Sequence, residues 1–337
     1  MTERIQKWDI HKFLMIFLMV LGHSADYFVA ESQAMRNLCM LIYTIHMPIF
    51  IFVAGLFSKR TVDEKRYDKM LGFLILYFVR KLLPYTYTFN GAENIRINFF
   101  RESGVPWFML AIFAFYMLTT ALKNYSAGYI SVFIVAFACA AGYDSNINDF
   151  LSLSRIIVFY PFFYFGYCAD IKKLENICNN KKLKAAAAAV IVVFVAVVLI
   201  WGKSIYWLRP LLAGRASYHA LKYLPKWGFL LRLGYYVVSC TVSFAVIILA
   251  PSKTPFGFCA KLGQRTLAVY MFHYALLYFI FDKFNCKELL ASPSGNTTEW
   301  LIIPISIVVT LIFSANIFTK ILQFITNIPK RKSIASQ

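Results

Sequence analysis

Long apolar runs recur along the whole sequence. Each is about 18 to 22 residues long, the length a helix needs to cross a bilayer core of roughly 30 Å. Hydrophobic residues make up 60% of the 337 residues and charged residues only 15%, whereas a soluble domain is about half apolar and about a quarter charged. Backbone groups inside lipid must satisfy one another, which favours helices, and the alternating pattern of a membrane barrel is absent. The sequence therefore predicts an all-α, polytopic integral membrane protein.

We predict about ten transmembrane helices in a single domain over residues 1–330, followed by a short basic cytoplasmic tail at 331–337. The first run, 10–30, is expected to remain as a span and not to be cleaved as a signal peptide. The third span is either 70–89 or a shorter span after an amphipathic cytoplasmic helix over 59–81. The predicted spans are 10–30, 38–57, 70–89, 106–122, 126–142, 152–169, 185–202, 229–250, 264–281 and 300–326.

The distribution of charge predicts the orientation and the partners. An even number of spans puts both termini on one side, and lysine and arginine are more numerous in the segments that then face the cytoplasm, so we predict both termini inside. The formal net charge of +19 lies in loops that flank spans, where it meets anionic lipid headgroups. We therefore expect a multi-pass protein of the cell membrane that contacts lipids and binds no nucleic acid.

Cysteine usage argues against a disulfide framework and a metal site. The seven cysteines are scattered, without a Cys-x-x-Cys pair and without clustering beside histidine. Those that fall in the predicted spans act as small apolar residues. Neither these residues nor any other feature of the sequence indicates an oligomeric state.

Three of the five histidines, His23, His46 and His273, fall in apolar runs. An ionisable imidazole is costly in hydrocarbon, so each is a candidate functional residue. Lys12 and His23 share one helix face, because eleven residues advance about 1100°, and they lie roughly 16 Å apart along the axis. Asp26, one turn after His23, is placed to accept from one ring N–H and so fix the tautomer. His46 and His273 are equally consistent with hydrogen-bonded core residues.

Several short motifs follow one another along the chain, and any one of them alone is a weak signal. In their order and spacing the chain resembles the membrane-bound acyltransferase 3 family, particularly its fucose 4-O-acetylase-like branch, over most of its length. The motifs are Asp9-x-x-Lys12-x10-His23-Ser24, Ile42-Tyr43-x-x-His46-Met47-Pro48-x-Phe50 with Ala54-Gly55, Leu82-Leu83-Pro84-Tyr85, Trp107-Phe108, Pro161-Phe162-Phe163-x-x-Gly166-Tyr167 and Tyr270-x-x-His273.

The resemblance implies a membrane-embedded O-acyltransferase. Such an enzyme moves an acyl group, usually acetyl from acetyl-CoA, to a hydroxyl of a cell-surface polysaccharide or its lipid-linked sugar precursor. The family's key histidine falls on His23 and its partner cation on Lys12, where the family often has arginine. Lysine keeps the charge but lacks the bidentate fork that suits phosphate. Acetyl-CoA is then a donor substrate, and no tightly bound cofactor is expected.

The expected mechanism assigns a role to each candidate. Neutral His23 acts as the general base on the acceptor hydroxyl. His46, His273 or a backbone N–H freed near Pro48 stabilises the developing oxyanion, and an acyl-histidine intermediate stays open. Cations hold the CoA phosphates; the candidates are Lys12, Arg80, Lys81 and Arg265, with Lys172 and Lys173 as further ones.

Two other functions fit the same residues. A proton-coupled secondary transporter of a small solute or glycan intermediate is the main alternative, because intramembrane histidines and aspartates also carry protons. The sequence shows no internal repeat and no paired broken helices that would support it. A non-catalytic assembly or sensing protein that kept the fold is a third possibility. The acceptor and the acyl chain length are not indicated by the sequence.

Overall fold

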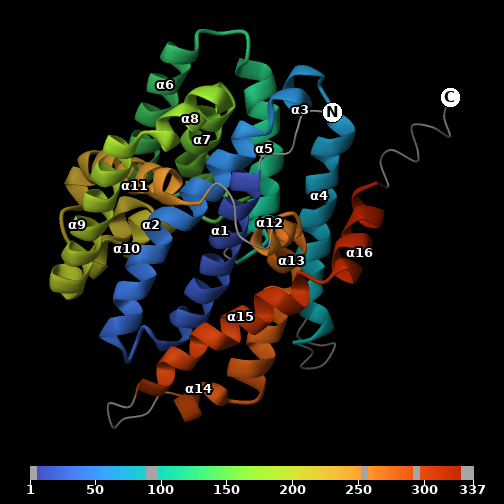
Figure 1. Ribbon diagram of the computed structural model, residues 1–337, viewed down its shortest axis with the longest axis vertical. Helices are drawn as coiled ribbons and strands as arrows, with labels where there is room; N and C mark the ends of the chain where they lie inside the picture. The colour runs from blue at the N-terminus through green and yellow to red at the C-terminus, as the bar shows by residue number, and fades with distance from the viewer. Residues whose placement is uncertain (1–5, 89–97, 103, 252–256, 291–296, 328–337) are drawn as a thin grey trace. The chain divides into compact units, whose positions relative to one another are not determined.

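The computed structural model describes residues 6–88, 98–102, 104–251, 257–290 and 297–327 (Figure 1). Regular structure in these residues is helical, and one isolated bridge joins Arg101 to Phe150. The all-α prediction is therefore confirmed for the part of the chain that is described. The α-helices are α1 Gln6–Ala25, α2 Gln33–Leu56, α3 Lys59–Asp63, α4 Tyr67–Leu82, α5 Trp107–Leu122, α6 Ala127–Ala140, α7 Leu153–Cys168, α8 Ile171–Asn179, α9 Lys181–Ile205, α10 Arg209–Ala213, α11 Gly228–Leu249, α12 Phe258–Gly263, α13 Thr266–Tyr278, α14 Cys286–Leu290, α15 Ile302–Phe313 and α16 Asn316–Thr326.

Every predicted span contains a helix, but few of these helices are long enough to cross a bilayer. In the described residues three helical stretches are long and apolar enough, or four if an interrupted pair counts as one span. Helices α5, α6 and α7 have 16, 14 and 16 residues, which corresponds to about 21–24 Å at the α-helical rise, short of roughly 30 Å. The stretches are Gln33–Leu56, Lys181–Ala213 and Pro225–Leu249, and the pair is Thr298–Phe313 with Asn316–Thr326. Ten spans with both termini inside thus stay a prediction.

The segment of the third predicted span is divided differently from both sequence alternatives. Lys65 has a φ of 48°, and this left-handed residue separates α3 from α4. Helix α4 begins at Tyr67 and ends at Leu82, where a 3-10 turn over Leu83–Thr86 follows, with Pro84 near its start. Neither a continuous helix over 59–81 nor a span over 70–89 is present. The predicted tail at 331–337 lies outside the described residues.

The chain divides into two compact units, each assembled from separate stretches of sequence. Unit 1 comprises Met1–Phe50, Ile171–Tyr206 and Val238–Thr319, and unit 2 comprises Ile51–Asp170, Trp207–Val237 and Lys320–Gln337. The prediction of a single domain over 1–330 stays a prediction.

Unit 1 is organised around α1, which packs against α12, α13 and α15 (Figure 1). Two glycines allow close approaches along α1. A Cβ on Gly263 would overlap the backbone carbonyl of Asp9, and one on Gly22 would come within 3.1 Å of Ile42 Cγ2. The beginning of α1 is thereby held against α12 and its end against α2.

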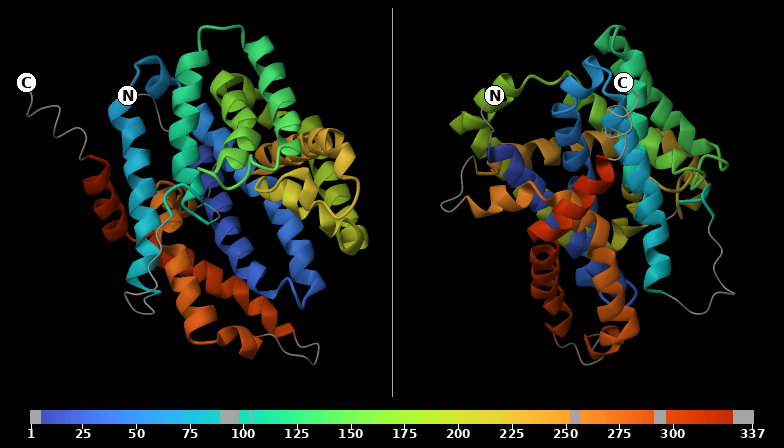
Figure 2. Two further views of the ribbon diagram at one scale, coloured as in Figure 1. Left: turned by 180° about the vertical axis from the view of Figure 1, so that it is seen from behind. Right: turned by 90° about the vertical axis from the view of Figure 1, so that its right-hand side faces the viewer.

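Unit 2 packs α5 against α4 and α7, and α7 against α6 (Figure 2). Aromatic rings fill the contact between α5 and α7: the ring centroid of Phe163 lies 5.3 Å from that of Phe115 and 5.5 Å from that of Tyr116. Offset and edge-on aromatic pairs of this kind contribute roughly 0.5–1.5 kcal/mol beyond their buried area. The aromatic side chains of α5 and α7 therefore form part of the core of unit 2.

Candidate active site

His23 differs from the other two histidines of the predicted spans in its accessibility. His46 is 3% exposed and His273 is fully buried, whereas His23 is partly exposed. Helix α1 runs without interruption from Gln6 to Ala25, so Lys12 and His23 do lie on one continuous helix. Among these three imidazoles, His23 has the most exposed surface.

Aromatic side chains from α2 and α13 surround His23. Its ring stacks on His273 with centroids 5.5 Å apart and an interplanar angle of 19°. Tyr274 meets His23 edge-on at 6.1 Å, and Tyr43 does so at 6.4 Å. The ring of His46 lies 5.0 Å from that of Tyr43. The three histidines that the sequence singled out are thus gathered in one place, although they are far apart along the chain.

The buried histidines share one hydrogen-bond pattern. His46 Nδ1 lies 2.8 Å from the carbonyl of Ile42, and His273 Nδ1 lies 3.0 Å from that of Val269. A carbonyl only accepts, so Nδ1 of both rings carries the hydrogen. Each neutral ring then offers a lone pair at Nε2, and donation from Nε2 to an oxyanion, the role expected for either residue, requires the imidazolium form.

Asp26 is connected to His23 through a tyrosine. The Tyr43 hydroxyl donates to Asp26 Oδ2 at 2.5 Å and lies 3.5 Å from His23 Nδ1. The Cys39 thiol also points to Asp26, with its sulfur 3.4 Å from Oδ1. The sequence placed Asp26 one turn beyond His23 but gave Tyr43 no role. The position of Tyr43, three residues before His46 on the same helix face, was the sequence signal that could have indicated a role for it.

Serines fix the end of α1 that carries His23. Ser24 Oγ donates to the Val20 carbonyl at 3.0 Å and lies 3.1 Å from Ser306 Oγ of α15. Both serines are fully buried. This contact holds the residue next to His23 against α15, while α13 supplies the stacking ring, so the imidazole is positioned from two further helices.

At the beginning of α1, Lys12 is already paired with a carboxylate. Lys12 Nζ lies 2.6 Å from Asp9 Oδ1, and Gln264 Nε2 lies 3.4 Å from Asp9 Oδ2. The Lys12 side chain is 26% exposed and that of Asp9 is 6% exposed. Arg265, a further candidate for phosphate, donates to the carbonyl of Ser314 at 3.0 Å. Lys12 and Arg265 therefore keep part of their surface accessible but have protein partners.

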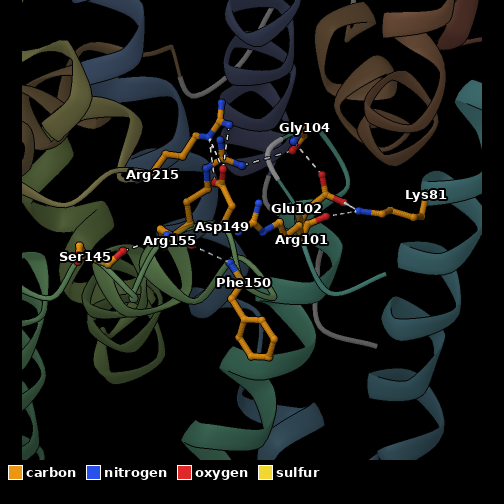
Figure 3. A network of polar contacts seen from close by, with 10 residues as sticks. Lys81, Arg101, Glu102, Gly104, Ser145, Asp149, Phe150, Arg155 and Arg215 are labelled. Carbon is orange, nitrogen blue, oxygen red and sulfur yellow. Dashed lines mark hydrogen bonds and ion pairs between the residues drawn. The ribbon is translucent and has the colours of Figure 1, made fainter. Parts of the chain in front are cut away.

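Arg80 and Lys81, two further candidate cations, belong to unit 2 and lie at the end of α4. Lys81 Nζ lies 2.6 Å from Glu102 Oε2 and 2.6 Å from the carbonyl of Arg101 (Figure 3). The same network continues from Glu102 to Gly104, and its Asp149 carboxylate binds Arg215 at 2.8 Å. The charge of Lys81 is therefore balanced inside the protein.

Arg80 has a different environment from Lys81. Its side chain is 1% exposed, and its Nε and Nη1 atoms are buried without a hydrogen-bond partner among the described residues. A buried guanidinium with open donors is costly unless an anion or a carbonyl meets it. Of Lys12, Arg80, Lys81 and Arg265, Arg80 has the most buried donor atoms without a hydrogen bond among the described residues.

The position of Arg80 and Lys81 along α4 bears on their predicted role. Lys123 Nζ contacts the carbonyls of Val62 and Asp63, so the end of α5 lies beside α3, whereas Lys81 lies at the far end of α4. A 16-residue helix is about 24 Å long. The distribution of charge predicts that the segment containing Lys59 is cytoplasmic. Lys81, at the far end of α4, then lies toward the opposite side of the membrane. For Arg80 and Lys81, the predicted orientation therefore conflicts with the predicted role in CoA binding.

Comparison with known proteins supports the resemblance derived from the motifs. The acyltransferase-domain family matches residues 5–319. The chain is similar to the nodulation protein NolL of Mesorhizobium japonicum, with 21% identity over 182 residues, 49% of this chain. The chain covers 48% of that relative's length, so the match spans about half of each protein. No solved structure matches the chain significantly. The apolar helices indicate a membrane protein. Because the family model covers nearly the whole chain, this protein belongs to the acyltransferase-domain family.

Proposed function

We propose that this protein is a membrane-embedded O-acyltransferase. It moves an acyl group, namely acetyl from acetyl-CoA, to a hydroxyl of a cell-surface polysaccharide or its lipid-linked sugar precursor. His23 is the general base, and the cell membrane is the location. The observation that carries the proposal is the accessible imidazole of His23, stacked on the buried ring of His273 and joined to Asp26 through Tyr43, in a chain of the acyltransferase-domain family.

The arrangement suits proton removal from an alcohol. A general base must be neutral to accept a proton, and the imidazole of His23, stacked on His273 with ring centroids 5.5 Å apart, can accept one at the ring nitrogen that carries no hydrogen. A positioned base of this kind contributes about 10²–10⁴-fold to the rate. The acceptor oxygen attacks the thioester carbonyl while its proton passes to His23, and CoA leaves as the thiol.

Charge along the chain supports an anionic donor. Lys12, Arg265, Lys172 and Lys173 are the candidate cations of unit 1, and Arg80 and Lys81 those of unit 2. Open guanidinium donors such as those of Arg80 form strong charge-assisted bonds with phosphate. Lys81 is a weak candidate, since Glu102 already neutralises it.

Mass spectrometry of cell-surface glycans, from cells with and without this protein, tests the function. We expect glycans from cells that lack it to be lighter by one acetyl group at each site. His23→Ala should abolish the acetylation, while His219→Ala, the same change at an exposed histidine in the 3-10 turn Tyr218–Ala220, should leave it intact. Expression and membrane insertion of both variants are compared by immunoblot of the membrane fraction.

The outcomes separate the alternatives. Acetylated product at near wild-type level from the His23→Ala variant contradicts the role of His23. An unchanged glycan profile, together with solute uptake by the purified protein in liposomes without acyl transfer, indicates a transporter instead.

A further inference from the structure

Tyr43 links the two polar groups at the end of α1. We propose that Tyr43 is a positioning residue that couples Asp26 to His23, holds His23 in the tautomer with its hydrogen on Nδ1, and so makes Nε2 the basic nitrogen. The assignment of the tautomer stands on geometry alone. Its catalytic consequence rests on the proposed function.

The direction of the hydrogen bonds fixes the tautomer. A phenol has one hydrogen to donate, and Tyr43 directs it to Asp26 Oδ2 at 2.5 Å. The Tyr43 oxygen therefore meets His23 Nδ1, 3.5 Å away, as an acceptor, which requires the hydrogen to be on Nδ1. A distance of 3.5 Å is long for such a bond, but catalytic hydrogen bonds are often long before substrate binds and shorten in the complex.

Asp26 has the surroundings of an ionised carboxylate. Its two oxygens receive two different donors, the Tyr43 hydroxyl at Oδ2 and the Cys39 thiol, 3.4 Å away, at Oδ1. A hydrogen bond to a charged acceptor is shorter and about twice as strong as one between neutral groups. The charge of Asp26 thus orders the Tyr43 hydroxyl, and the hydroxyl in turn orients the imidazole.

Packing holds the Tyr43 ring in this place. A Cβ on Gly22 would lie 3.8 Å from Tyr43 Cε2 and 3.1 Å from Ile42 Cγ2, so the small residue at position 22 leaves room for α2 to approach α1. On its other side, the ring meets His46 edge-on at 5.0 Å. His46 is itself fixed by the carbonyl of Ile42. The buried His46 therefore acts as a support for Tyr43, which gives it a role other than oxyanion stabilisation.

The coupled groups complete a proton cycle. The acceptor hydroxyl gives its proton to Nε2 as its oxygen forms a bond to the thioester carbonyl carbon, and the imidazolium that results faces Asp26 through Tyr43. When the tetrahedral intermediate collapses, the carbon–sulfur bond breaks and Nε2 returns the proton to the thiolate. The ester and the CoA thiol leave, and His23 regains its starting tautomer.

Kinetics of Tyr43→Phe tests the coupling, with Tyr27→Phe as the matched control. Tyr27 also donates to a carboxylate, Asp282 Oδ2 at 2.8 Å, so both changes remove one tyrosine–aspartate bond and keep the ring. We expect kcat of Tyr43→Phe to fall by about tenfold or more, a part of the about 10²–10⁴-fold that acid–base catalysis supplies. KM for acetyl-CoA should stay nearly unchanged, and Tyr27→Phe should keep its kcat. Adding Asp26→Asn to Tyr43→Phe should lower kcat little further, because coupled residues act together.

Nitrogen NMR of the ¹⁵N-histidine-labelled protein reads the tautomer without any reaction. The His23 signals, assigned by their loss in His23→Asn, should show hydrogen on Nδ1 in the wild-type protein and a mixture of tautomers in Tyr43→Phe. Hydrogen on Nε2 in the wild-type protein, or an unchanged tautomer in Tyr43→Phe, overturns the proposal, as does an unchanged kcat. If the wild-type protein transfers no acyl group, the proposed function fails, while the NMR result still decides the tautomer.

Discussion

Two ion pairs of unit 2 each join a basic side chain to a glutamate, and one pair is buried while the other is exposed. Lys81 and Glu102 lie 2.6 Å apart with side chains 11% and 4% exposed, whereas Arg60 and Glu64 are 77% and 52% exposed. Removing one partner of a buried pair leaves an uncompensated charge. An exposed pair contributes only about 0.2–1 kcal/mol, because water and salt screen it. Burial therefore decides which of the two carboxylates matters for stability.

We predict that Glu102→Gln destabilises the protein by about 3 kcal/mol, because Lys81 then stays buried without its counter-charge. The melting temperature of the purified protein in detergent measures this. The same change at Glu64 is the control and should lower the melting temperature little. Equal effects at both positions would show that Lys81 does not depend on Glu102.

Sequence reasoning at this scale found the histidines but not their connections. The polar character of His23, His46 and His273 in apolar runs was visible from sequence, and the structure gathers all three. The role of Tyr43 was not visible from sequence, because nothing distinguishes one tyrosine from another in an aromatic-rich helix. Only the structure places Asp26 beside its hydroxyl. The pairing of Lys12 with Asp9, one turn apart, follows from helical spacing alone.

Helices α2 and α7 meet through glycines that belong to two of the sequence motifs. A Cβ on Gly55 would overlap the carbonyl of Phe163, and one on Gly166 would overlap the carbonyl of Phe52. Each helix therefore needs a glycine where the other passes. Small residues that allow close helix approach are typical of membrane interfaces, and this explains why glycine stands at these places in the motifs.

We predict that Gly55→Ala and Gly166→Ala each cost about 1–3 kcal/mol, because the backbone must move to admit a methyl group. Folded yield after detergent extraction and the melting temperature measure the loss. Gly234→Ala in α11 is the matched control, because no atom lies within 4 Å of its Cβ position. A variant at Gly55 as stable as the one at Gly234 would contradict the close approach.

Element boundaries show what periodicity can and cannot predict. The apolar runs located the helices. Pro48, near which freed backbone groups were expected, and Pro161 both lie inside continuous α-helices. The runs overestimated some helices, such as α4, because apolar residues continue into 3-10 turns such as Leu83–Thr86. Helices α2 and α9 are longer than their predicted spans. Hydropathy measures solubility in lipid and does not register where the helical hydrogen bonding stops.

At the scale of the whole molecule, the predicted orientation is tested on the two ends of α6. Exposed Ser126 precedes this helix and exposed Ser145 follows it. With the N-terminus inside, the loop of Ser126 faces the cytoplasm and that of Ser145 faces outward. The excess of lysine and arginine in the predicted inner segments is the physical basis of this expectation.

We predict that a membrane-impermeant maleimide on intact cells labels Ser145→Cys and leaves Ser126→Cys unlabelled until the cells are permeabilised. Both variants are made in a background in which the seven native cysteines are replaced. The reversed pattern would place the N-terminus outside. Labelling of both residues on intact cells would show that α6, only 14 residues long, does not span the membrane.

Helix α1 sets a fixed distance between two residues of the proposed site. Lys12 and His23 are fixed to one uninterrupted helix, eleven positions apart, which separates them by roughly 16 Å along its axis. Neither residue can approach the other by changing its rotamer alone. An acyl donor that touches both must be long, with its anionic end remote from its reactive carbonyl. Compact activated acids, in which phosphate adjoins the acyl carbon, are too short to bridge the two. If Lys12 and His23 have the proposed roles, the helix therefore selects donors by length as well as by charge.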